Sequence, residues 1–178
     1  VKPAVWFDGL DDSLDADTLV PTFSGSNKPL HALTVLKSNV ANAGNITAWA
    51  FGASADLDPG LRLIGQNSGT NNCRFQERND SNVLTSLTGG NITARSLVYA
   101  QSTTVSTILR MNGAQVATNS ALSGQTTLAR FAIGCISRST RILFWDGTIQ
   151  EIVFYPTDMT TSQAGLESNI NAHYSIYP

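Results

Sequence analysis

The chain has 178 residues, a formal net charge of -2, 42% apolar residues and only 13% charged residues. Its eleven Lys and Arg residues are scattered and form no basic stripe that would bind a nucleic-acid backbone. We therefore expect no nucleic-acid partner. No run of 18 apolar residues is present, so we expect no membrane insertion either. Ser, Thr, Asn and Gly separate short apolar runs, which is typical of an all-β protein rich in turns.

Aspartates crowd the start of the chain. Their carboxylates are hard oxygen ligands of the kind that calcium prefers. The spacing matches no defined calcium loop, however, and Asp also bonds its own backbone in tight turns. The group is therefore either a calcium site, with Asp8, Asp11 and Asp12 as candidate ligands, or a set of turn-forming residues. Its members are Asp8, Asp11, Asp12, Asp15 and Asp17.

Two alternating runs predict strands with one buried face. In residues 73–78, Cys73 and Phe75 fall on one face, while Arg74 and the other polar residues fall on the opposite, wet face. Residues 129–133 read the same way, with Phe131 inward. The regular spacing of such runs between turn residues favours a sandwich or barrel.

A β-hairpin is predicted near the middle of the second half. Val105, Leu109 and Met111 share one face of the run 103–111, and an Asn-Gly pair at positions 112 and 113 follows directly. Asn-Gly tolerates the positive φ that a type I′ turn demands, so residues 114–118 should return as the partner strand.

A later run is apolar on both faces. Ile149, Val153 and Tyr155 fall on one face, and Ile152 and Phe154 fall on the other. This pattern predicts a strand in the middle of the molecule.

From residue 160 the apolar period changes to that of a helix. Thr160 and Gln163 have the spacing of a capping box, and the helix should cover about residues 161–174. It is too short and polar to stand alone, so we expect its apolar stripe to pack on the sandwich. The stripe consists of Leu166, Ile170, His173 and Tyr174.

Taken together, several segments resemble concanavalin A-like lectin and glucanase domains, also called laminin G-like, which occur in secreted bacterial proteins and bacteriophage virion proteins. The resemblance implies one domain over residues 1–178, an all-β two-sheet antiparallel jelly-roll β-sandwich with one short C-terminal helix. It also implies sugar on a concave face or rim loops and, in some members, a calcium ion. The matching segments are Phe7-Asp-Gly9 with Asp11-Asp12, residues 31–37, 110–116, 131–134 and 145–155, and, after the helix, residues 173–176.

Three tryptophans are the candidate sugar-binding residues. An indole stacks on the apolar face of a pyranose, and Trp6, Trp49 and Trp145 are the residues best suited to this role. Aromatic residues also fill β-sandwich cores, so each Trp has an alternative place in the core. His31 and His173 are expected to be packed, hydrogen-bonded groups without a metal.

The carboxylates argue against catalysis. Glycoside hydrolysis needs two carboxyl groups across the scissile bond, and hydrolases of the resembling family carry them close together on one strand. Here the only Glu residues are Glu77, Glu151 and Glu167, and none has an acidic neighbour at strand spacing. We expect no catalytic residue, with Glu151 as a partly buried structural carboxylate.

Cysteines and glycosylation motifs leave alternatives open. Cys73 and Cys135 either form a disulfide or are buried thiols. Asn-x-Ser/Thr motifs start at Asn45, Asn79 and Asn91; they fit an extracellular surface but also arise readily in so Asn- and Thr-rich a chain.

The favoured function is a non-catalytic recognition or assembly module of an extracellular particle, such as a bacteriophage tail fibre, spike or head-decoration protein that meets glycans. Its partners would be glycans or other virion or surface proteins, with a homo-oligomer as a further option, and its location extracellular or on the virion. One alternative is a carbohydrate-binding module of a secreted bacterial enzyme. Another is a glycan hydrolase with an unusual site.

Overall fold

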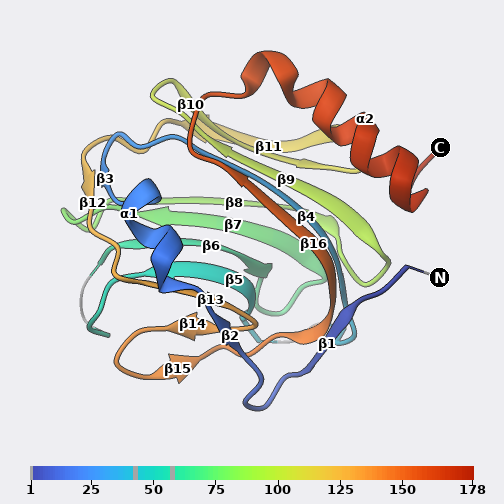
Figure 1. Ribbon diagram of the computed structural model, residues 1–178, viewed down its shortest axis with the longest axis horizontal. Helices are drawn as coiled ribbons and strands as arrows, with labels where there is room; N and C mark the ends of the chain where they lie inside the picture. Colours follow the sequence, from blue (N-terminus) through green and yellow to red (C-terminus); the bar gives the residue numbers. More distant parts are fainter. Residues whose placement is uncertain (1, 42–43, 57–58) are drawn as a thin grey trace.

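Two six-stranded antiparallel sheets pack face to face in the computed structural model, which describes residues 2–41, 44–56 and 59–178 (Figure 1). The first sheet has the order β1-β16-β4-β9-β10-β11, and the second has the order β2-β13-β5-β6-β7-β8. Strands hold 49% of the described residues. The all-β jelly-roll sandwich expected from the sequence is confirmed.

The strands of the first sheet are β1 (Val5–Asp8), β4 (Leu30–Ser38), β9 (Ser96–Ser102), β10 (Ser106–Met111), β11 (Ala114–Ser120) and β16 (Asp146–Tyr155). Those of the second are β2 (Leu14–Asp15), β5 (Ile46–Gly52), β6 (Leu61–Gln66), β7 (Asn72–Arg78), β8 (Leu84–Asn91) and β13 (Arg130–Ile133). Two short pairs complete the strands: β3 (Gly25–Ser26) with β12 (Gln125–Thr126), and β14 (Ile136–Ser137) with β15 (Arg141–Ile142). The helices are α1 (Val20–Phe23) and α2 (Gln163–Tyr174), each preceded by a 3-10 turn, η1 (Asp17–Leu19) and η2 (Thr160–Ser162).

Aromatic rings fill the space between the two sheets. The rings of Phe51 and Phe131 lie 4.4 Å apart, and Phe154 meets Trp49 edge-on at 5.0 Å. The indole Nε1–H of Trp49 donates to Thr34 Oγ1 at 2.9 Å, so this buried polar group is satisfied. Such a core leaves function to the two outer faces of the sandwich and to its rims.

Each outer face carries one covering element. Helix α2 lies over the first sheet (Figure 1), where Ile170 packs with Leu33, Leu97 and Tyr99. The hairpin β14–β15 lies on part of the second sheet and buries Leu63, among others. The predicted packing of the helix on the sandwich is therefore confirmed, and the uncovered part of each face remains accessible.

The predicted type I′ hairpin is confirmed, because Asn112 and Gly113 have φ angles of 50° and 79° between β10 and β11. One residue of its predicted inward face was wrong. Val105 precedes the strand and is 81% exposed, while Thr107 takes the inward position beside Leu109.

A β-bulge corrects the predicted faces of β16. The register shifts between Ile149 and Glu151, which inserts one extra residue and reverses the alternation beyond it. Ile149 and Phe154 therefore both face the core, whereas Glu151 and Val153 face outward. An insertion of this kind is invisible to a strict period of two.

The start of α2 also differs from the prediction. No side-chain hydrogen bond caps its N-terminus, so the capping box of Thr160 and Gln163 does not form. Instead, Asp158 Oδ1 accepts hydrogen bonds from the backbone N–H of Thr160 at 2.9 Å and from its hydroxyl at 2.6 Å. His173, a member of the predicted apolar stripe, is exposed, whereas Glu167, which is not a member of it, is buried. No helix in the described part of the chain has the length and apolar character needed to cross a membrane.

Both cysteines are free and buried, which supports the buried-thiol alternative. Burial raises the pKa of Cys73 to about 12. Among the glycosylation motifs, Asn79 is 5% exposed and its amide donates to Ser123 O at 2.7 Å, so it does not lie on the surface.

Candidate functional site

The structure separates the three tryptophans. Trp49 and Trp145 are 0% exposed in the core between the sheets, so both are wrong as sugar-stacking candidates. Their indoles contribute apolar surface that the core buries. Trp6 is 62% exposed on β1 and stays a candidate platform for a sugar ring.

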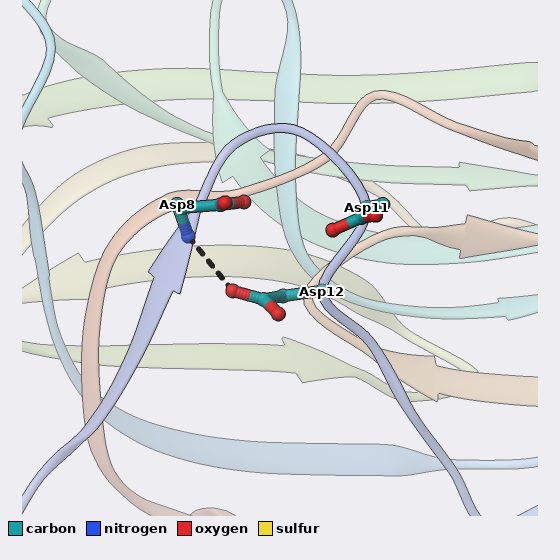
Figure 2. A group of neighbouring side chains, drawn as sticks. All are labelled: Asp8, Asp11 and Asp12. Atoms are coloured by element: carbon teal, nitrogen blue, oxygen red, sulfur yellow. Dashed lines mark hydrogen bonds between the residues drawn. The ribbon is translucent and has the colours of Figure 1, made fainter.

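Three of the five N-terminal aspartates lie together around the loop after β1 (Figure 2). One oxygen of each of Asp8, Asp11 and Asp12 lies within 4.8 Å of the others. This spacing suits a common calcium ion, whose oxygen ligands lie at about 2.3–2.6 Å. The same carboxylates also act in the turn: Asp12 Oδ2 accepts from Asp8 N at 3.1 Å, and Asp8 Oδ1 accepts from Leu10 N at 2.8 Å. The arrangement of Asp8, Asp11 and Asp12 therefore fits a calcium site as well as a set of turn-forming residues.

The other two aspartates of this segment are used elsewhere. Asp15 forms an ion pair with Arg141. Asp17 pairs with Arg130 at 3.0 Å and accepts from the backbone N–H of Phe131 at 2.8 Å. Neither is available to a calcium ion at the first loop.

The three glutamates lie in three different environments. Glu77 is fully buried between the sheets beside Arg62 at 3.2 Å. Glu167 is a buried residue of α2 and pairs with Arg110 at 3.0 Å. Glu151 is half-buried on the outer face of β16. The absence of catalysis stays a prediction.

A polar face on the second sheet was not recognised as a site from the sequence. Strand β7 sends Arg74, Gln76 and Arg78 outward, because Cys73 and Phe75 fill the core. The outward residues of β8 beside them are Leu84, Ser86 and Thr88, paired with Arg78, Gln76 and Arg74 in that order. None of these six residues carries a carboxylate, so the face is cationic and rich in hydroxyl and amide groups.

Arg74 is the unusual residue of this face. It is only 7% exposed, although the alternating pattern predicts a wet position. Its Nε and Nη2 are buried, and within the described residues they have no hydrogen-bond partner. Burial lowers the pKa of the guanidinium, and the neighbouring Cys73 acts in the opposite direction. Solvent reaches only Nη1, so a cation without a counter-ion faces outward through one nitrogen.

Two further arginines lie on the outer face of the second sheet. Arg78 is half-buried, and its Nε likewise lacks a partner among the described atoms. Arg138, from the hairpin β14–β15, lies over Gly52 and donates to the carbonyl of Asp56 at 2.7 Å. A buried arginine normally has a carboxylate or phosphate partner, so this face is suited to an anionic group supplied by a ligand.

A polar recess of about 270 Å³ lies on the other side of the sandwich, between β16 and α2. Its lining residues are Glu151, Asn169, Ile170, His173 and Tyr174. The Tyr174 hydroxyl donates to the carbonyl of Gln150 at 3.4 Å, and its pKa is raised by burial and by the nearby carboxylate of Glu151.

His31 is a packed, hydrogen-bonded group, as predicted. The backbone N–H of Met159 donates to its Nε2 at 3.1 Å, so the proton lies on Nδ1, which contacts the Tyr99 hydroxyl at 2.5 Å. Burial lowers the pKa of His31, and Asp158 at 3.5 Å acts in the opposite direction. The exposed His173 has only a ring contact with Tyr174, so the same prediction is wrong for it.

No protein-family model matches the chain, and no curated protein matches it. Several solved structures are similar to it in fold. The CBM40 domain of the Ruminococcus gnavus IT-sialidase, bound to α2,3 sialyllactose, has a TM-score of 0.73 at 12% identity, over 92% of this chain and 95% of that one. The NanB sialidase of Streptococcus pneumoniae gives 0.72 at 12% identity, over 93% of this chain and 28% of that one. The SAP-like pentraxin of Limulus polyphemus gives 0.65 at 13% identity, over 90% of this chain and 79% of that one.

At such identities the similarity concerns the fold. The chain folds as a concanavalin A-like jelly-roll domain, as the resemblance in its sequence predicts.

Proposed function

We propose that this domain is a carbohydrate-binding module that holds a carboxylated glycan on the outward face of β7 and β8. Arg74 carries the proposal, because it is a buried cation whose only solvent-facing nitrogen lacks a partner. A sugar carboxylate would supply the missing charge, and a charge-assisted hydrogen bond is about twice as strong as a neutral one.

The neighbours of Arg74 suit a sugar as well as an anion. Ser86, Thr88 and Gln76 present hydroxyl and amide groups that can bond sugar hydroxyls. Arg78 adds a second cation next to Leu84, which is 47% exposed and offers an apolar surface. Polar groups converging beside an apolar surface are the usual composition of a small-ligand site.

Structural neighbours point the same way. A CBM40 domain of the same fold binds sialyllactose, a glycan that carries a carboxylate. Within this proposal the domain is a non-catalytic binder, which corresponds to the alternative of a carbohydrate-binding module attached to a bacterial enzyme. The virion role finds no support in the comparisons. An extracellular location, with Asp8, Asp11 and Asp12 holding a calcium ion that would rigidify the first loop, belongs to the proposal as well.

Titration calorimetry with 3′-sialyllactose and with lactose tests the proposal, since the two ligands differ by the carboxylated sugar. We expect binding of 3′-sialyllactose and at least tenfold weaker binding of lactose. Arg74→Gln should weaken the sialyllactose affinity by roughly 10- to 100-fold, the equivalent of about 1.5–3 kcal/mol for a hydrogen bond to a charged group. A digalacturonate ligand distinguishes sialic acid from other carboxylated sugars.

Arg130→Gln is the matched control, because Arg130 lies on the same sheet but already pairs with Asp17. It should leave the affinity unchanged. Arg74→Gln should also leave the melting temperature unchanged or raise it, since it removes a buried charge without a partner. Equal affinities for lactose and sialyllactose, or an unchanged affinity in folded Arg74→Gln, would refute the proposal.

A further inference from the structure

The first sheet carries a separate surface with sugar-binding chemistry, on the side opposite to Arg74. We propose that Trp6 and the recess beside α2 form a second site, for a neutral oligosaccharide. The proposal shares the ligand class of the proposed function but depends on none of its residues.

Trp6 points to the same side of the first sheet as the recess. Its neighbour Phe7 is buried in the core, so the indole of Trp6 faces outward beside its cross-strand partner Thr148. Glu151, three residues further along β16, also faces outward because of the bulge. Because of the bulge, Thr148 and Glu151 pair with Lys37 and Val35, which are two residues apart on β4. At about 3.3 Å per residue, roughly 7 Å of strand separates Thr148 from the recess, a span that a short oligosaccharide can bridge.

The recess has hydrogen-bonding capacity that the fold does not use. The side-chain amide of Asn169 makes no hydrogen bond with any other described residue, and the ring nitrogens of His173 make none either. The carboxylate of Glu151 and the hydroxyl of Tyr174 lie close to one another in its lining. An amide, a carboxylate and an imidazole around one recess can donate to and accept from the hydroxyl groups of a sugar.

An exposed indole beside this recess supplies the apolar contact. Trp6 is 62% exposed, more than any other Trp, Phe or Tyr in the described chain. Glu151 within the recess disfavours a carboxylated sugar through charge repulsion. The two faces therefore divide the ligand classes, with carboxylated sugars at Arg74 and neutral sugars at Trp6.

Nuclear magnetic resonance on the isotope-labelled chain tests this site with cellotriose and maltotriose as probes. At least one probe, at millimolar concentration, should shift the indole N–H signal of Trp6 and the side-chain amide signal of Asn169. Trp6→Ala should weaken that binding by about tenfold or more, whereas Trp6→Phe should retain part of it. Glu151→Gln should weaken it without unfolding the chain.

Val105→Ala is the matched control, since it removes an exposed apolar side chain elsewhere and should leave the affinity unchanged. Arg74→Gln should leave neutral-sugar binding intact, and Trp6→Ala should leave sialyllactose binding intact, so the two proposals fail separately. Absence of a Trp6 shift with every probe would overturn the second site. So would a neutral-sugar affinity that Trp6→Ala leaves unchanged.

Discussion

Breaking the buried ion pair between Arg62 and Glu77 should strongly destabilise the folded chain. Glu77 is 0% exposed and Arg62 is 3% exposed, with 3.2 Å between Arg62 Nε and the carboxylate. Arg62 Nη2 also donates to the carbonyl of Lys28 at 2.7 Å. Because Glu77→Ala leaves the guanidinium buried without its counter-ion, it should lower the free energy of unfolding by about 3–5 kcal/mol. For a chain of this length that corresponds to a fall of roughly 6–20 °C in melting temperature.

The double variant separates lost charge balance from lost packing. Arg62→Met with Glu77→Leu removes both charges at similar volume, so it should recover most of the stability that Glu77→Ala loses. Arg141→Ala, which breaks an exposed pair with Asp15, should cost only about 0–1 kcal/mol. Urea unfolding followed by circular dichroism gives all three values. A cost below about 1 kcal/mol for Glu77→Ala would refute the reasoning.

Three further predictions concern the helix, the buried histidine and the first loop. Ile170→Ala should lower the free energy of unfolding by about 2–4 kcal/mol, and exposed Ser168→Ala by less than about 0.5, in thermal unfolding. The folded state lowers the pKa of His31 below 6.5, so stability should be complete above about pH 6.5 and fall as the pH drops below it. His31→Gln should show less of this loss when unfolding is measured from pH 8 to pH 5, and parallel curves would contradict the assignment. Millimolar calcium should raise the melting temperature, with a smaller rise in Asp11→Asn; no shift would favour the turn-forming role.

The sequence alone identified some of the candidate site residues. The crowding of aspartates at the start of the chain made Asp8, Asp11 and Asp12 candidates, and the exposed Trp6 was among the three tryptophan candidates. The sequence could not separate Trp6 from Trp49 and Trp145, because local pattern does not tell which indoles the second sheet covers.

The local pattern by itself determined the all-β class, the Asn-Gly hairpin, the strand β7 and the terminal helix. These features depend on periods of two or 3.6 residues and on backbone preferences at single turns, which neighbouring residues specify. Tertiary structure alone decided that Arg74 is buried without a carboxylate and that Glu151 faces the helix. The burial of Arg74 depends on which strands and hairpins lie beside β7. The orientation of Glu151 depends on a bulge that shifts the register of β16. Both arise from contacts between segments far apart in the chain, which no local period encodes.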